Sequence, residues 1–357
     1  MKKHAVLSAV LSGTLLLSGC SSILQRSYSF VTPHSAAPVV ESDKMTIRAE
    51  SYQDVVNALL HYITQGKETG AIRLYNYPYD VEQDMEAACK EVLTEAPLGA
   101  YAVADIDYRI TPIVSCYEAV VEISFRRTPQ QVSQIISATG TSAIRTRLQK
   151  AMAAYQEELV LRINYLEDEE DYLDGLLKQA YFSSPQTALG FPQVEVHLYP
   201  ESGPHRIAEF LFTYPASAQE LTQRSQQVLQ AADALLQAHQ NISGDARLLA
   251  VCAQVKKQVT YLPSGGQTAY AALVESRANS TGLSLAVQLL CQKLSTPCRM
   301  VEGSLKGASH TWVIVDTQDG PRHLDLSQNQ TPAFRSDSEL TRAGYRWDTS
   351  SYPVCGE

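Results

Sequence analysis

The sequence lacks several features by which large functional classes are recognised. It has no excess of basic residues: 29 Lys and Arg stand against 38 Asp and Glu, which gives a net charge of −9. Nucleic acid needs a basic surface on its partner, so nucleic-acid binding is disfavoured, and so is broad attraction to anionic lipid. A glycine-rich phosphate loop is missing, as is an acidic run of calcium-loop spacing in the C-terminal part. We therefore predict no cofactor and no bound metal.

A long hydrophobic run is missing as well. The apolar run from Ala5 to Leu17 is shorter than the ~20 residues that cross a bilayer as a helix. It follows a basic start and ends at Leu17-Ser-Gly-Cys20, which resembles the bacterial lipoprotein signal. The resemblance implies that residues 1–20 hold a signal peptide and that Cys20 is acylated, which makes the lipid bilayer a partner at the extracytoplasmic face of the cell membrane. An ordinary cleaved secretory peptide is the alternative.

Cysteine is thinly spread along the chain. With Cys20 assigned to lipid, the remaining cysteines are scattered, unlike those of a small disulfide-stapled scaffold. We expect most of them to be buried apolar residues. The close pair Cys291 and Cys298 has no second pair or histidine cluster at zinc spacing, so a metal site there is weakly supported. The remaining cysteines are Cys89, Cys116, Cys252, Cys291, Cys298 and Cys355.

The first half of the sequence repeats itself. Residues 21–44 carry Ser, Pro and Ala without periodicity and predict a tether. Residues 45–243 then contain two stretches with the same order of alternating and helical patterns, and Val120–Phe125 can be laid over Ile207–Phe212 almost position for position. We predict two β-α-β-β-α units, with coincidental β-hairpin patterning as the alternative. The predicted strands are 69–77, 103–110, 118–125, 159–165, 194–199 and 206–212, and the predicted helices are 80–93, 168–181 and those that open at Thr128 and Ser217.

Two features of this half have ordinary structural explanations. The acidic run at 167–171 suits the first turn of a helix better than a metal site, because negative side chains stabilise a helix N-terminus. The chain has 19 tyrosines, many on predicted strands, where tyrosine usually packs with its hydroxyl at the rim. A surface on which glycans or peptides stack is the alternative for these tyrosines.

The C-terminal part carries an ordered set of chemically capable residues. A turn signal at Asn241–Gly244 precedes a predicted helix over 246–259 and a turn at 263–266. Ser280-Thr-Gly282 then opens an apolar helix, His310-Thr-Trp312 heads an apolar strand, and His323-Leu-Asp325 lies on the next strand. Neighbouring antiparallel strands can set His310 beside Asp325, and the carboxylate would then fix the imidazole tautomer.

This order resembles the core of the transglutaminase-like, papain-related superfamily, in which a Cys, a His and an Asp follow one another. The resemblance covers about 80 residues and implies that Ser280, His310 and Asp325 occupy the catalytic positions, with Ser280 where the family has its cysteine. His323 is interpreted as a strand residue, because no tryptophan follows it at the family's spacing. The fold class implied is α+β: two repeat units, then a helix-plus-antiparallel-sheet domain over 244–335 and a C-terminal tail over 336–357.

The serine changes the expected chemistry. A thiol has a reference pKa of about 8.5 and forms a thiolate beside a histidine, whereas an alcohol is far less acidic and needs the histidine as a general base. Cys291 cannot stand in, because it lies about 16 Å further along the same helix. Ser280 also has an ordinary reading as a helix N-cap.

We favour a catalytically silent domain that binds or scaffolds a peptide or a peptidoglycan stem. The alternative is an acyl-transfer enzyme, an amidase, protease or transglutaminase that uses Ser280, His310 and Asp325.

Overall fold

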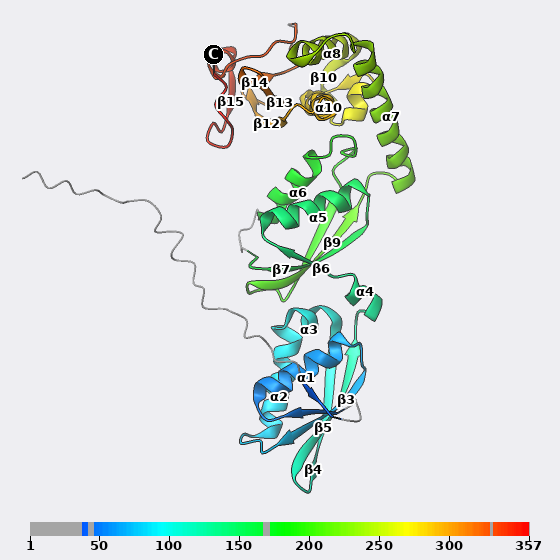
Figure 1. Cartoon of the computed structure of the whole chain (residues 1–357), viewed down its shortest axis with the longest axis vertical. Helices are drawn as coiled ribbons and strands as arrows, with labels where there is room; N and C mark the ends of the chain where they lie inside the picture. The colour runs from blue at the N-terminus through cyan, green and yellow to red at the C-terminus, as the bar shows by residue number, and fades with distance from the viewer. Residues whose placement is uncertain (1–37, 42–45, 167–171, 329–330, 357) are drawn as a thin grey trace, which may run out of the picture.

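The computed structural model describes residues 38–41, 46–166, 172–328 and 331–356. Cys20, the predicted signal and most of the predicted tether lie outside these residues, and so does the acidic run at 167–171. Within the described part, none of the helices is both long and apolar enough to cross a membrane. Figure 1 shows three units that follow one another along the longest axis of the molecule, with the C-terminal unit at the opposite end from the first.

The first unit is a five-stranded sheet with helices on one face (Figure 1). The strand order is β1-β2-β3-β5-β4; only β2 and β3 run parallel. Helix α1 starts at a capping box between Ser51 and Asp54, and α2 starts where the Asp80 side chain accepts two backbone N–H groups. The elements are β1 (Val39–Val40), β2 (Thr46–Ala49), α1 (Tyr52–Thr64), β3 (Thr69–Tyr75), α2 (Val81–Thr94), α3 (Pro97–Ala102), β4 (Val103–Ile113) and β5 (Cys116–Phe125).

The second unit repeats this architecture. Its strand order is β6-β7-β9-β8, with β6 and β7 parallel and the other pairs antiparallel. A short helix, α4 (Pro129–Ser133), joins it to the first unit and is capped by Thr128, as the sequence predicts. The elements are β6 (Ile136–Thr139), α5 (Thr141–Ala153), β7 (Glu158–Asn164), α6 (Tyr172–Phe182), β8 (Gln193–Tyr199) and β9 (His205–Thr213).

Each repeat has one more strand and one more helix at its start than the sequence indicates. The strand-helix-strand-strand order is present in both units, and each unit also begins with a parallel strand and a helix, β2-α1 and β6-α5. Four-residue strands are too short to show an alternating pattern, which is why they were missed. The helices expected at the ends of the units do not cover their sheets. Helix α4 buries no residue, and α7 (Ala218–Ala238) runs to the third unit, where it contacts α9 (Ala269–Leu273) and α10 (Ser280–Lys293).

The third unit packs helices against a four-stranded antiparallel sheet of order β14-β13-β12-β15. Residues 263–266, expected to form a turn, belong instead to a strand that pairs in parallel with β11. The segment after residue 335 contributes α11 and β15 to this unit. The elements after α7 are α8 (Gly244–Gln258), β10 (Thr260–Gly266), α9 (Ala269–Leu273), β11 (Arg277–Ala278), α10 (Ser280–Lys293), β12 (Cys298–Leu305), β13 (Ala308–Thr317), β14 (Gly320–Leu324), α11 (Asp337–Ala343) and β15 (Tyr345–Trp347).

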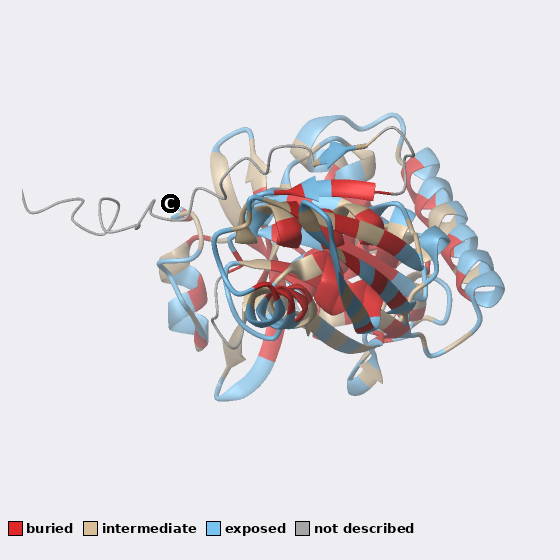
Figure 2. Ribbon diagram, turned by 90° about the horizontal axis from the view of Figure 1, so that it is seen from below, coloured by how far each residue is buried: buried red, intermediate tan, exposed pale blue. Residues whose placement is uncertain are grey.

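The hydrophobic cores tie the units together. One core runs without interruption from the helices and sheet of the second unit into α8, α9, α10 and the inner face of β13. A second core fills the first unit and includes Val160 and Ile207 from the sheet of the second unit. Figure 2, a view along the long axis, shows the buried residues gathered between sheets and helices, with exposed residues on the outer helix faces. The units therefore form a stack with shared apolar contacts.

A partly buried ion pair lies at the joint between the first and second units. Arg127 follows β5 and donates from Nη2 to both carboxylate oxygens of Glu209 on β9, at 2.7 and 2.9 Å. The Glu209 side chain is only 4% exposed, and the hydroxyl of Tyr199 donates to it at 3.1 Å. Burying a carboxylate is costly unless donors compensate it, so Arg127 is needed wherever the two units are docked.

We therefore expect Arg127→Ala to lower the free energy of unfolding by about 2–4 kcal/mol, because it leaves Glu209 buried without its cation. The measurement is the urea unfolding midpoint. Asp233→Ala is the matched control: it breaks an ion pair with Lys293 in which the aspartate is 65% exposed, and it should cost less than about 1 kcal/mol. Equal effects of the two substitutions would show that the joint does not depend on this pair.

Candidate functional site

His310 and Asp325 meet as their positions on neighbouring strands predict. His310 lies on β13, and Asp325 follows the last residue of β14, with Val313 and Leu324 paired across the ladder. The Nε2 atom of His310 lies 2.8 Å from Oδ2 of Asp325. The imidazole is 4% exposed and the carboxylate 9%, so the pair is shielded from water.

Asp325 accepts hydrogen bonds from two more residues, which sequence reasoning missed. The hydroxyl of Tyr345 donates to Oδ2 at 2.6 Å. Ser327 donates its hydroxyl to the same oxygen at 3.0 Å and its backbone N–H to Oδ1 at 2.8 Å. Burial raises the pKa of Asp325, but the hydrogen bond and electrostatic interaction with His310, followed by the hydrogen bonds from Tyr345 and Ser327, outweigh burial and hold this pKa below its usual range. The carboxylate is therefore ionised.

The donors around Asp325 select one tautomer of the neutral imidazole. Because a carboxylate only accepts hydrogen bonds, the Nε2 atom of His310 must carry the hydrogen. The Ser327 hydroxyl lies 3.1 Å from the same Nε2 and can share that hydrogen while it donates to Asp325. Nδ1 is then the unprotonated nitrogen, which is the atom that a general base would use.

Ser280 is the first residue of α10, at the positive end of that helix. Its side chain does not cap the helix, because the N-cap is Asn279, whose side chain accepts from the N–H of Gly282 at 3.1 Å. The Ser280 residue is 8% exposed, and its Oγ accepts a hydrogen bond from the backbone N–H of Thr311 at 3.3 Å. The ordinary capping role considered for Ser280 thus falls to its neighbour.

The start of α10 is pressed against the backbone of the preceding segment. A Cβ atom on Gly282 would lie 2.6 Å from the carbonyl oxygen of Gly266 and 3.0 Å from that of Thr268, so only glycine fits. On the other side, the hydroxyls of Thr281 and Thr311 lie 3.2 Å apart. These contacts fix Ser280 beside β13 with little freedom to move.

Ser280 packs against one side of β13, and the His310 side chain points to the other side. Thr311 turns its side chain towards α10, whereas His310 stacks on Trp312 and contacts the ring edge of Tyr345. Among the described residues, no hydrogen bond joins the Ser280 hydroxyl to His310, although the hydroxyl lies against the residue next to it. The structure brings the three predicted site residues into one region and pairs two of them directly.

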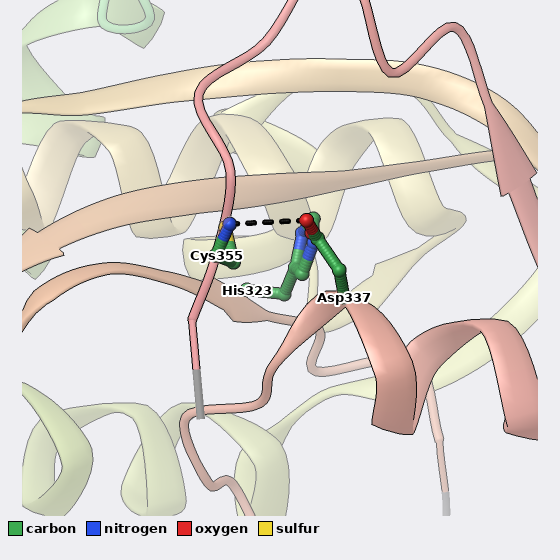
Figure 3. Close-up of side chains that lie close together, drawn as sticks. All are labelled: His323, Asp337 and Cys355. Atoms are coloured by element: carbon green, nitrogen blue, oxygen red, sulfur yellow. Dashed lines mark hydrogen bonds and ion pairs between the residues drawn. The ribbon is translucent and has the colours of Figure 1, made fainter.

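A second His-Asp pair lies behind the first and has a structural function. The indole N–H of Trp312 donates to Nδ1 of His323 at 2.9 Å, and Nε2 of His323 lies 2.7 Å from Oδ1 of Asp337. Figure 3 shows that Cys355 completes this group, through a backbone N–H that donates to Asp337 at 3.1 Å. His323 is fully buried. It is a strand residue, as the sequence indicates.

His323, Asp337 and Cys355 are residue types that bind metals, but the tautomer of His323 does not suit a metal ligand. The Nδ1 atom of His323 accepts from Trp312, so Nε2 must carry the hydrogen that goes to Asp337. A metal on Nε2 would move that hydrogen to Nδ1, where it would oppose the indole N–H. Burial, followed by the charge of Asp337, also raises the pKa of Cys355 to about 12 and keeps its thiol protonated.

The free thiols of Cys291 and Cys298 lie away from the Ser280 hydroxyl. All six cysteines of the described part are free, and four of them are buried. Cys291 is on the last turn of α10, and Cys298 starts the following strand, so both lie towards the far end of that helix. Burial raises the pKa of Cys252 well above its ordinary value.

A cavity of about 340 Å³ lies on the Asp325 side of the site. Its walls include Asp325, Gln328, Leu340 and Tyr345, so the site borders a space lined by residues of α11 and β15. Nearby, the ammonium group of Lys256 donates to the backbone oxygen of the residue after Asp325 at 3.0 Å. Burial lowers the pKa of Lys256, while the charge of Asp325 opposes that change.

His323 gives the structure a testable pH dependence. Burial lowers the pKa of His323, despite the hydrogen bond and charge of Asp337, whereas an unfolded histidine has a pKa of about 6.5. Below that pH the unfolded chain takes up a proton that folded His323 resists, so the free energy of unfolding falls as the pH drops. The stability advantage of the wild type over His323→Gln should be larger at about pH 7.5 than at about pH 5.5, measured by urea unfolding.

The exposed His197, with a side chain 48% exposed, supplies the control. His197→Gln should unfold like the wild type at both pH values. A wild-type advantage that does not change with pH in the His323→Gln comparison would show that His323 is protonated equally in the folded and unfolded chains.

The sequence matches no protein-family model and shows no significant match to a curated protein. Among solved structures, a TGase is 12% identical over 65% of this chain and 68% of its own, with a TM-score of 0.29. A candidate cysteine protease from Cytophaga hutchinsonii is 11% identical over 46% and 70% of the two chains, with a TM-score of 0.27. A candidate protease from Parabacteroides distasonis is 6% identical over 74% and 44%, with a TM-score of 0.23. At these values the similarities say nothing about activity, which has to be argued from the site.

Proposed function

We propose that this chain is a lipid-anchored, extracytoplasmic protein whose C-terminal unit is a transglutaminase-like domain that binds a ligand and no longer catalyses acyl transfer. The proposal joins the lipoprotein-like signal that ends at Cys20 to the site formed by Ser280, His310 and Asp325. The order of α10, β13 and β14 is the one that the sequence resemblance implies.

The surroundings of Ser280 are the observation that supports a site without catalysis. Its hydroxyl accepts from the Thr311 backbone, and no hydrogen bond links it to His310 within the described residues. An alcohol needs a base in direct contact to become a nucleophile, because it does not ionise at neutral pH. The pair of His310 and Asp325 therefore has no activated nucleophile to serve.

The proposed ligand is a peptide or a peptidoglycan stem, the class of amide substrate that the resemblance implies. The described chain enters the molecule at the first unit, which carries β1, while Ser280 lies in the unit at the opposite end (Figure 1). An anchor before the first unit would thus be attached at the end of the molecule opposite the candidate site. Calorimetric titration of the mature protein with a stem peptide would measure the binding directly.

An acyl-transfer enzyme with a serine nucleophile is the second candidate. It is favoured by one observation: the carboxylate of Asp325 and the imidazole of His310 are correctly paired, with Nδ1 left as the base. For this enzyme, the Ser280 hydroxyl would have to exchange its contact with the Thr311 N–H for one with the imidazole. In that case Oγ would attack a substrate carbonyl while Nδ1 took its proton.

Ser280→Cys tests whether position 280 still lies close enough to His310 to activate a nucleophile, even if the natural serine is inactive. A thiol at the positive end of α10 and near His310 should have a lowered pKa, so iodoacetamide should alkylate it at about pH 7 at least about tenfold faster than an ordinary buried thiol. The reaction is followed by mass spectrometry of the intact protein. His310→Ala in the same variant should remove the rate advantage.

Ser284→Cys is the matched control, because Ser284 is also buried and lies one turn further along α10. Equally slow alkylation of the two variants would mean that position 280 shares no site with His310, and both candidate functions would fail. Labelling of wild-type Ser280 by a fluorophosphonate, lost on His310→Ala, would establish the serine enzyme in place of the silent domain.

Lipid anchoring is tested at Cys20. The acyl chains would be attached through its thiol, so Cys20→Ala should abolish incorporation of labelled palmitate and release the chain from the membrane fraction. Cys89→Ala, which removes a buried thiol, should leave both unchanged. Palmitate incorporation that survives Cys20→Ala would refute the predicted anchor.

A further inference from the structure

Three side chains converge on one oxygen of Asp325. Its Oδ2 lies within hydrogen-bonding distance of His310 at 2.8 Å, Ser327 at 3.0 Å and Tyr345 at 2.6 Å. Ser327 is two residues from Asp325 in sequence, whereas Tyr345 comes from β15, beyond α11. The 2.6 Å contact is the shortest of the three and falls in the range of a hydroxyl that donates to a charged oxygen.

The packing of Tyr345 fixes the direction of its hydroxyl. The residue is 4% exposed, and its ring meets Trp312 edge-on at 5.1 Å and His310 at 5.7 Å between ring centroids. Its backbone pairs with Leu305 of β12, which sets its height on the sheet. A side chain held on three sides in this way aims its hydroxyl at Asp325 without losing further rotamer freedom.

The hydroxyl acts as a donor at every ordinary pH. Burial, followed by the negative charge of Asp325, raises the pKa of Tyr345, so its proton stays on the oxygen. The other titratable groups that face Asp325 are His310 of β13, Lys256 of α8 and Tyr261 of β10. Of these, His310 alone shares a hydrogen bond with the carboxylate, so Tyr345 and His310 compete for one acceptor.

We propose that Tyr345 is a positioning residue of the candidate site: its hydroxyl holds the Asp325 carboxylate so that His310 keeps its hydrogen on Nε2 and presents Nδ1 as the unprotonated nitrogen. The proposal rests on the proposed function only in taking Ser280, His310 and Asp325 as one site, and it holds whether or not Nδ1 acts as a base. It makes the C-terminal segment, which lies outside the part of the chain that resembles the superfamily, a component of the site.

Tyr345→Phe tests the proposal, because it removes the donor and keeps the ring. In the wild type, long-range proton–nitrogen NMR spectra of His310 should show a single tautomer protonated on Nε2. In Tyr345→Phe the carboxylate is free to shift, so the two nitrogen signals should move towards each other as the second tautomer appears. The Asp325 carboxyl should also titrate at higher pH, because a donor that lowers its pKa is gone.

Tyr352→Phe is the matched control. Tyr352 packs against the same hydrophobic cluster, but its hydroxyl contacts the backbone N–H of Glu302 at 3.4 Å and not Asp325. A structural role alone would let both phenylalanine variants lower the unfolding midpoint with the His310 spectrum unchanged. A Tyr345→Phe spectrum identical to the wild type would therefore overturn the proposal.

A second readout links Tyr345 to the site. In Ser280→Cys protein, Tyr345→Phe should slow alkylation by about tenfold and shift its pH profile, whereas Tyr352→Phe should change neither. If the His310 tautomer responds to Tyr345→Phe but Ser280→Cys is never reactive, the positioning role stands and the proposed function fails. An unchanged tautomer together with an unchanged alkylation profile refutes the positioning role and leaves the proposed function intact.

Discussion

The buried charge of Asp325 is the constraint on which the C-terminal unit depends. An ionised carboxylate that is almost out of contact with water is tolerated only when donors surround it. Here the donors come from β13, from the turn after β14 and from β15, so the charge can be satisfied only when the sheet is complete. Local chemistry and overall topology are thereby coupled: a strand that slips by one residue would turn His310 or Tyr345 away and leave the carboxylate unpaired.

The stack of repeats depends on a different constraint, which is seen when the outer sheet faces of the two units are compared. Ile207 and Glu209 on β9 are buried against the first unit, whereas Val120 and Glu122, on the corresponding outer face of β5, are exposed. The same sheet face is therefore an interface in one unit and an end in the other. A stack of repeats needs a terminal unit whose outer face tolerates water. The first unit meets that need with charged side chains around Val120, which is 42% exposed.

The sequence predicted those parts of the site that depend on local order. His310 lies on β13 and Asp325 directly follows β14, and a tight turn joins these strands, so the pairing of the two residues follows from register. Ser280 follows from the helix that it opens. Tyr345 could not be found in this way, because its role depends on β15 pairing with β12 across an intervening helix. The first strand of each repeat was also hidden, since four residues show no period and their partners are distant.

The two His-Asp pairs give His310 and Asp325 structural contacts that do not depend on catalysis. Trp312 lies between them: it stacks on His310 and donates its indole N–H to His323. Removing His310 would open a space beside Trp312 and leave Asp325 short of a donor, so the loss would cost stability whether or not acyl transfer takes place. The side chain at position 280, in contrast, contacts the strand through one weak hydrogen bond of 3.3 Å. The side chain at position 280 is thus held by fewer contacts than those of His310 and Asp325.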